Sequence, residues 1–126
     1  MKIFLGIVPL LTVLGLAQPA SSFTAENGLE VLATGSRDFT VPYGGLSGPA
    51  DFWCAAGDYA LRELGLRSGA QIYRTSAAPR RAGDGMRFSL DATAAVRSTG
   101  LLLIGPKTAG ITAGHARSLC DIPLKR

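Results

Sequence analysis

The stretch DFWCAAGDYALREL, residues 51–64, has the pattern of a helix that packs on a hydrophobic core. Small and apolar side chains recur in it at spacings of three and four residues, which is the period of one helix face. These positions are Trp53, Ala56, Gly57, Ala60, Leu61 and Leu64. Pro49 suits a first helical turn, Asp51 suits the positive end of a helix, and Gly65 is a typical stop. The pattern therefore predicts a helix over about 49–64.

Segments on both sides of this helix have the patterns of strands. They are residues 29–34, 38–43, 70–77, 86–91, 100–105 and 111–120. Pro42 has no N–H to donate, which predicts an edge strand or an extended segment for 38–43. We expect 70–77 and 86–91 to pair as an antiparallel hairpin, and 92–99 to form one helical turn or a loop. Strands, a helix and further strands predict an α+β fold, a small antiparallel sheet with the main helix packed on one face. Gly57 is then expected to allow close approach to that sheet.

The N-terminus has the features of an export signal. Lys2 precedes an uncharged apolar run, and Gly15 and Ala17 occupy the small-residue positions before a cleavage site. We therefore expect a signal peptide over 1–17, with 20–22 as later alternative cleavage positions, and a periplasmic or extracellular mature protein. An uncleaved anchor is the other interpretation, but the run is shorter than the roughly 20 apolar residues of a membrane span, so we expect no span after cleavage. Residues 18–28 are then a flexible leader, and 29–126 form a single α+β domain.

The charge is positive but dispersed. The 126 residues include 13 basic and 9 acidic side chains, for a net charge of +4. Nucleic-acid-binding proteins concentrate their basic residues in a stripe with aromatic residues between them, whereas here the arginines are scattered and only Arg80 and Arg81 among them are adjacent. This pattern argues against a nucleic-acid partner. Arg80, Arg81 and Arg87, near the tip of the predicted hairpin, form a candidate anion-binding surface, since arginine pairs well with carboxylates and phosphates. An acidic polymer or another envelope protein is the kind of partner expected.

The two cysteines, Cys54 and Cys120, predict one disulfide, because an even number of cysteines in an exported protein is typical of paired thiols. The bridge would fasten the C-terminal segment to the first turns of the predicted helix. On chain-entropy grounds a loop of this length stabilises the folded state by about 4 kcal/mol.

Cysteine catalysis is the alternative. A thiol near the start of a helix has a lowered pKa, and His115 is the only histidine and so the only imidazole base. A cysteine on a helix, followed by a distant histidine on a strand, resembles the arrangement in papain-like cell-wall peptidases. The resemblance covers only these residues. It implies Cys54 as nucleophile and His115 as base, with Asp121 as a residue of the right type to orient the histidine.

No metal or cofactor is expected, because Cys54, Cys120 and His115 lack the local spacing of a zinc site. Trp53 and Tyr59 are candidates for a ligand pocket, but their place on the helix face favours the core.

The segments FWCAAGDYA (52–60) and ARSLC (116–120) resemble those of small uncharacterised exported proteins of α-proteobacteria. That likeness implies export and a disulfide, and no activity. The sequence thus predicts a small exported, disulfide-bonded envelope protein that acts as a non-catalytic binding or interaction module. The alternative is a thiol hydrolase that uses Cys54 and His115.

Overall fold

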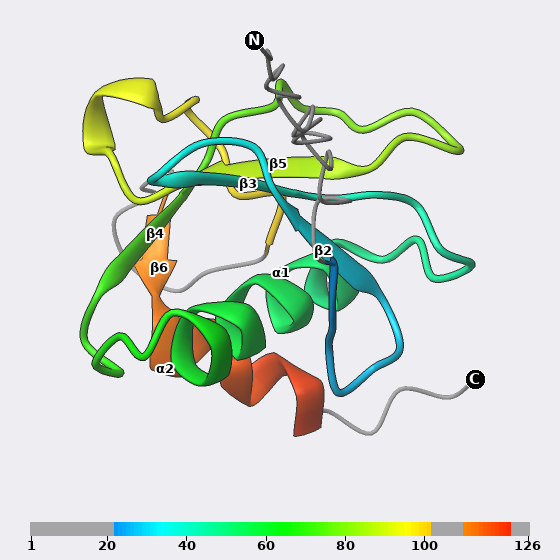
Figure 1. Ribbon diagram of the computed structural model, residues 1–126. Coiled ribbons are helices and arrows are strands. Elements are labelled where there is room, and N and C mark those ends of the chain that lie inside the picture. Colours follow the sequence, from blue (N-terminus) through cyan, green and yellow to red (C-terminus); the bar gives the residue numbers. More distant parts are fainter. Residues whose placement is uncertain (1–21, 102–109, 122–126) are drawn as a thin grey trace, which may run out of the picture.

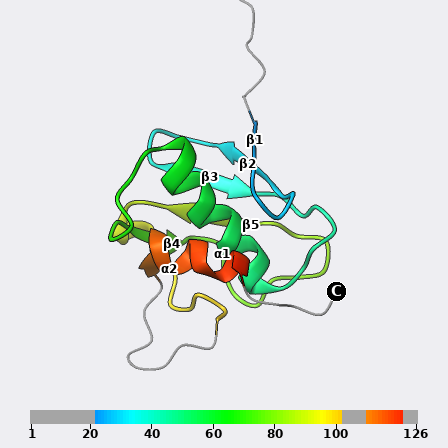
Figure 2. The ribbon, with the colours of Figure 1, turned by 90° about the horizontal axis from the view of Figure 1, so that it is seen from below.

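The computed structural model describes residues 22–101 and 110–121, which form one six-stranded sheet with helices packed against it (Figure 1). The strands are β1 (Ser22–Thr24), β2 (Glu30–Ala33), β3 (Asp38–Val41), β4 (Gln71–Arg74), β5 (Met86–Ser89) and β6 (Gly110–Thr112). They lie in the order β1-β2-β3-β5-β4-β6, and each neighbouring pair is antiparallel. Helix α1 (Pro49–Asp58) crosses one face of the sheet, and helix α2 (Ala113–Ser118) lies alongside α1 (Figure 2). The predicted α+β class is confirmed.

The main helix begins and ends close to the predicted residues. Asp51 closes its first turn, because its N–H donates to the Gly48 carbonyl at 2.9 Å and its carboxylate accepts the Gly48 N–H at 3.2 Å. After α1 the chain continues directly into one π-helical turn, Tyr59–Glu63. Gly65 then adopts φ +65, a left-handed conformation that ends helices and that glycine adopts at little cost. The prediction of a helix over about 49–64 is therefore confirmed.

The core lies between α1 and the sheet face that α1 covers. Alternate strand residues point into it, as expected for strands with one buried face. They include Val31, Phe39, Val41, Ile72, Met86 and Phe88. Trp53 of α1 meets the Phe88 ring edge-on at 4.8 Å between centroids, and Tyr59 lies 4.8 Å from the Phe39 ring. Trp53 and Tyr59 are thus core residues, as their spacing predicted.

Two predictions for the N-terminal half are wrong. Residues 22–28 are not a flexible leader, because Ser22–Thr24 pairs with β2 as strand β1. Strand β3 is not at an edge, since it is hydrogen-bonded to β2 on one side and β5 on the other. Pro42 does not interrupt this pairing because β3 ends one residue before it. The predicted signal peptide lies outside the described residues, as do leader residues 18–21.

The hairpin formed by β4 and β5 is confirmed, and residues 92–99 contain one helical turn, Ala92–Ala94. The predicted strand over 111–120 is wrong beyond residue 112. Thr112 ends β6 and caps α2, since its Oγ1 accepts the N–H of His115 at 3.1 Å. A short 3-10 turn, Leu119–Asp121, follows α2. Of the strand predicted at 100–105, residues 100 and 101 are not in a strand, and the others lie outside the described residues.

Gly57 does provide a close approach, but to a helix and not to the sheet. A Cβ atom at this position would lie 2.4 Å from the backbone nitrogen of Arg117 and 2.8 Å from Ala116. Only a residue without a side chain lets α2 lie this close to α1. Among the described residues, no helix has the length and apolar character needed to cross a membrane.

Candidate functional site

The disulfide between Cys54 and Cys120 is present, which confirms the predicted pairing. Cys54 lies in α1 and Cys120 in the turn after α2, with 4.8 Å between their Cα atoms and a sequence separation of 66. Cys54 is 1% exposed. The bond therefore holds α2 against α1 in the region where Gly57 permits their contact. It also leaves neither sulfur as a free thiol.

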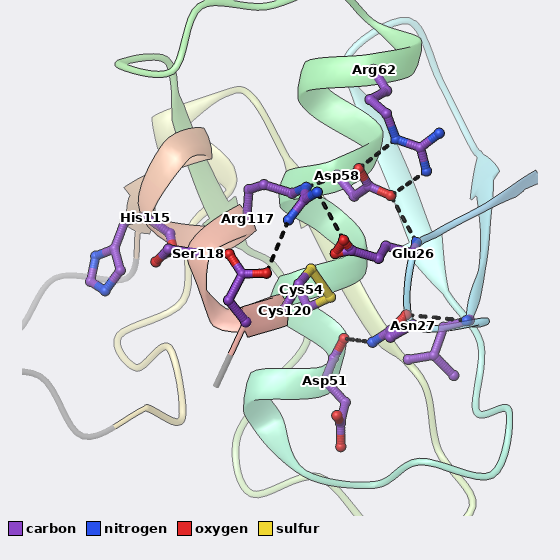
Figure 3. The surroundings of a disulfide bond; sticks show 12 residues. Glu26, Asn27, Asp51, Cys54, Asp58, Arg62, His115, Arg117, Ser118 and Cys120 are labelled. Atoms are coloured by element: carbon purple, nitrogen blue, oxygen red, sulfur yellow. Dashed lines mark hydrogen bonds and ion pairs between the residues drawn. A yellow bond between two sulfur atoms is a disulfide. The ribbon is translucent and has the colours of Figure 1, made fainter. Parts of the chain in front are cut away.

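The catalytic pair proposed as the alternative is not assembled. His115 lies on helix α2, where a strand was expected, and its exposed ring points away from the disulfide (Figure 3). Asp121 does not orient the histidine, since its carboxylate faces the guanidinium of Arg117 at 3.9 Å. A nucleophile and its base need to lie within hydrogen-bond reach. Cys54 and His115 do not meet that requirement, and the Cys54 sulfur is already bonded.

The carboxylate of Asp58 is buried near this disulfide and is the ionisable group there that could act as a catalytic acid or base (Figure 3). It accepts hydrogen bonds from Nε of Arg62 at 2.7 Å, from Nε of Arg117 at 3.1 Å and from the backbone N–H of Glu26 at 2.8 Å. Arg117 also donates to the carboxylate of Glu26 at 2.9 Å. The network joins the turn after β1 to both helices.

The electrostatics of this network indicate a structural role. Burial raises the pKa of Asp58, but the hydrogen bonds from Arg62 and Glu26 and the charges of Arg62 and Arg117 outweigh burial, so its pKa is below its ordinary value. A carboxylate that stays ionised and is fully occupied by donors is a poor general acid or base. Asp58 therefore stabilises the helix pair and does not serve as a catalytic group.

The three arginines expected at the hairpin tip are not used in the same way. The Arg80 guanidinium donates to the carbonyl oxygens of Arg81, Asp84 and Ser47, and it also covers the Phe52 ring at 4.8 Å. Arg81 and Arg87 are exposed. Arg80 and Arg87 line two different hollows of the surface, so the three side chains do not converge on one site.

The hollow beside Arg80 contains a residue that the sequence analysis missed. It has a volume of about 520 Å³ and lies where the N-terminus of α1 meets the end of β4. Its lining includes Ser47, Pro49, Arg74, Pro79, Arg80, Met86 and Gly100. We call it the Arg74 cavity. Its walls are mainly apolar, and two guanidinium groups supply its charge.

Arg74 is 2% exposed, which is unusual for a charged side chain. Its Nη2 donates to the Ala77 carbonyl at 3.1 Å and its Nη1 to the Thr99 carbonyl at 3.4 Å, while Nε has no hydrogen-bond partner in the part of the chain that the structure describes. No carboxylate within residues 22–101 and 110–121 pairs with it. Burial, and then the charge of Arg80, lower the pKa of Arg74.

One signal could have revealed Arg74. It lies two positions after Ile72 in the strand QIYR, so both side chains point to the core face of β4. A cation at an inward position of a strand is a reason to look for a charged or polar partner.

Comparison of the chain with protein-family models, with curated proteins and with solved structures finds no match. Within the described part of the chain, no cluster of three His, Cys, Asp or Glu side chains is placed to hold a metal ion.

Proposed function

We propose that this protein is an exported, non-catalytic binding module whose disulfide holds a rigid helix pair against a sheet. The observation that carries the proposal is the Cys54–Cys120 bond. Cys54 is the residue that the sequence suggested as a nucleophile, and in the disulfide its sulfur is not available as a thiolate. Cys54 therefore has a structural role.

Several features support export to the periplasm or the cell exterior. Residues 1–17 have the pattern of a cleaved signal, and disulfides persist mainly in oxidising compartments. A long loop closed by a disulfide suits a small domain that has to stay folded outside the cell.

The scaffold has the rigidity that a binding surface requires. The disulfide and the Asp58 network both fasten α2 to α1, and α1 in turn packs on the sheet. Another envelope protein or an acidic polymer is the expected kind of partner. Exposed Arg81 and Arg87 suit a polymer of the latter kind, and such binding would weaken as salt increases.

The first test is the redox state of the secreted protein. The full chain is expressed with its own N-terminus in a bacterial periplasm, and the product is examined by intact mass and by thiol labelling. We expect removal of the N-terminal segment, no labelling without reductant, and a mass lower than that of the reduced form by a pair of hydrogen atoms. The variant Cys120→Ser, which leaves Cys54 unpaired, is the matched control for labelling.

The same samples test the alternative of a thiol hydrolase. Neither the wild type nor Cys120→Ser is expected to hydrolyse peptide or ester substrates, because His115 is not within reach of the Cys54 sulfur. Rapid labelling of Cys54 in the wild-type protein, together with hydrolysis that Cys54→Ala abolishes, would refute the proposed binding role.

A further inference from the structure

We infer that the Arg74 cavity binds the carboxylate of a small organic acid, with the apolar part of that acid against Pro49, Pro79 and Met86. The inference rests on the proposed binding role and names a ligand class for it. It is carried by the burial of Arg74, the absence of a paired carboxylate among the described residues, the second guanidinium of Arg80 and the apolar walls.

Two buried charges in this molecule, Asp58 and Arg74, differ in how well they are compensated. Asp58 is supplied with two arginines and a backbone N–H, which is what a buried ion needs to offset its loss of water. Arg74 has two neutral carbonyl acceptors, one of them at 3.4 Å, and its Nε has no partner within residues 22–101 and 110–121. A buried cation left in this condition is costly to the folded state. A bound anion would reduce that cost.

A second cation lies close to Arg74. Arg80 lines the same cavity, and its positive charge contributes to the lowered pKa of Arg74. The Arg80 guanidinium donates hydrogen bonds to carbonyl oxygens and lies over an aromatic ring. Within the described residues it pairs with no carboxylate. An anion between the two groups would replace their repulsion by two attractions.

Gly100 determines how much space is left beside the guanidinium of Arg74. Gly100 lines the cavity, has φ +82, and lies so close to the guanidinium that a Cβ there would be 2.8 Å from Nη1 of Arg74. A side chain at residue 100 would therefore clash with this nitrogen, whereas glycine leaves space beside it on the cavity side. The bond from Nη1 to Thr99 is long, so a carboxylate oxygen can take its place at little cost.

The walls indicate which anion fits. Guanidinium groups bind carboxylate and phosphate alike, but the apolar lining of this cavity disfavours a dianion that would have to lose much of its water. A volume of about 520 Å³ falls in the usual range for small-molecule sites, which are mostly apolar with a few polar groups that orient the ligand. A monoanionic carboxylate attached to a short apolar chain satisfies both features.

The test uses the oxidised, folded protein labelled with ¹⁵N and hexanoate as the probe, with hexanol and inorganic phosphate as comparison ligands. The Nε–H resonance of Arg74 is followed by NMR during titration. We expect a saturable shift with hexanoate and none with hexanol or phosphate. Arg80→Gln should weaken hexanoate binding about tenfold or more, since a hydrogen-bonded charge is lost. Arg97→Gln removes an exposed arginine outside the cavity and should leave binding unchanged.

Arg74→Met lacks the reporter Nε–H, so its titration is followed through the backbone amide resonances around the cavity, and hexanoate should cause no saturable shift there. The amide spectrum without ligand reports whether the fold is kept. If this variant does not fold, the comparison of Arg80→Gln with Arg97→Gln still decides. Equal binding of hexanol, binding of phosphate in place of hexanoate, equal loss in both glutamine variants, or no saturable shift would each overturn the inference. These failures leave the binding role standing with another ligand, whereas a reactive Cys54 thiol would refute the role itself.

Discussion

Gly57→Ala should destabilise this protein, although a Gly→Ala change at an exposed helix position usually stabilises the helix by about 1 kcal/mol. The added Cβ would lie 2.4 Å from the backbone nitrogen of Arg117 and 2.8 Å from the carbonyl carbon and the Cβ of Ala116. Non-bonded carbon contacts are favourable only from about 3.5 Å outward, so α2 would have to move away from α1 by roughly 1 Å.

Two attachments resist that movement. The Cys54–Cys120 bond lies one turn before Gly57, and the Asp58–Arg117 ion pair lies directly beside it. Overpacking costs about 1–3 kcal/mol, and these restraints favour the upper end of the range. After the gain in helix propensity, we expect a net loss of about 2 kcal/mol in the free energy of unfolding. For a domain of this size the midpoint of thermal unfolding should fall by about 10 °C.

The assay is thermal and urea unfolding of the oxidised protein, followed by circular dichroism. Gly69→Ala is the matched control, because a Cβ at that residue meets no atom within 4 Å. The control should be unchanged or slightly more stable, by up to about 1 kcal/mol. If Gly57→Ala is as stable as the wild type or more stable, α2 does not pack against Gly57 as described, and the reasoning is wrong.

Three further predictions concern the contacts that hold the two helices together. Reducing the Cys54–Cys120 bond should lower the free energy of unfolding by about 4 kcal/mol, measured by urea unfolding with and without reductant, and equal stability would contradict a structural disulfide. Asp58→Asn should cost about 3 kcal/mol because the amide carries no charge to pair with the two arginines and replaces one acceptor oxygen by an NH2 group that faces other donors. The exposed Asp121→Asn should cost less than about 0.5 kcal/mol. The pKa of Asp58 is lowered in the folded protein, so the stability that its ionised form contributes is fully present above its unfolded pKa. That contribution is lost as the pH falls through the folded pKa. The stabilities of the wild type and Asp58→Asn should therefore converge as the pH falls below about 4. Thr112→Ala removes the N-cap of α2 and should cost about 1 kcal/mol by the same unfolding assay, and no change would show that the cap is dispensable.

Local patterns were a good guide to the main helix and to the hairpin. The spacing of the small and apolar residues in 51–64 and the glycine at 65 act over a few residues, so they predict α1 and its end without knowledge of the fold. The alternation of apolar and polar residues in 86–91 predicted a strand for the same reason, because it indicates which side chains face the core. The disulfide was also predicted, but from the count of cysteines and the expected compartment.

The C-terminal segment and the site chemistry were harder to predict. Residues 113–118 form a helix because Thr112 caps them and because Ala113 and Ala116 fill the space beside α1. That space exists only after α1 has packed on the sheet. The same dependence explains why His115 was placed on a strand and why Gly57 was assigned to a contact with the sheet.

The sequence by itself determined the α+β class, the position of the main helix and the pairing of Cys54 with Cys120, because periodicity, capping and cysteine parity can be read without coordinates. Only the tertiary structure decided that Gly57 meets α2, that Asp58 pairs with two arginines, and that Arg74 lies buried beside a cavity with no carboxylate partner among the described residues. Each of these depends on which distant segment is packed against the residue. Desolvation and contact distance are set by that packing, and neither is encoded in the spacing of neighbouring residues.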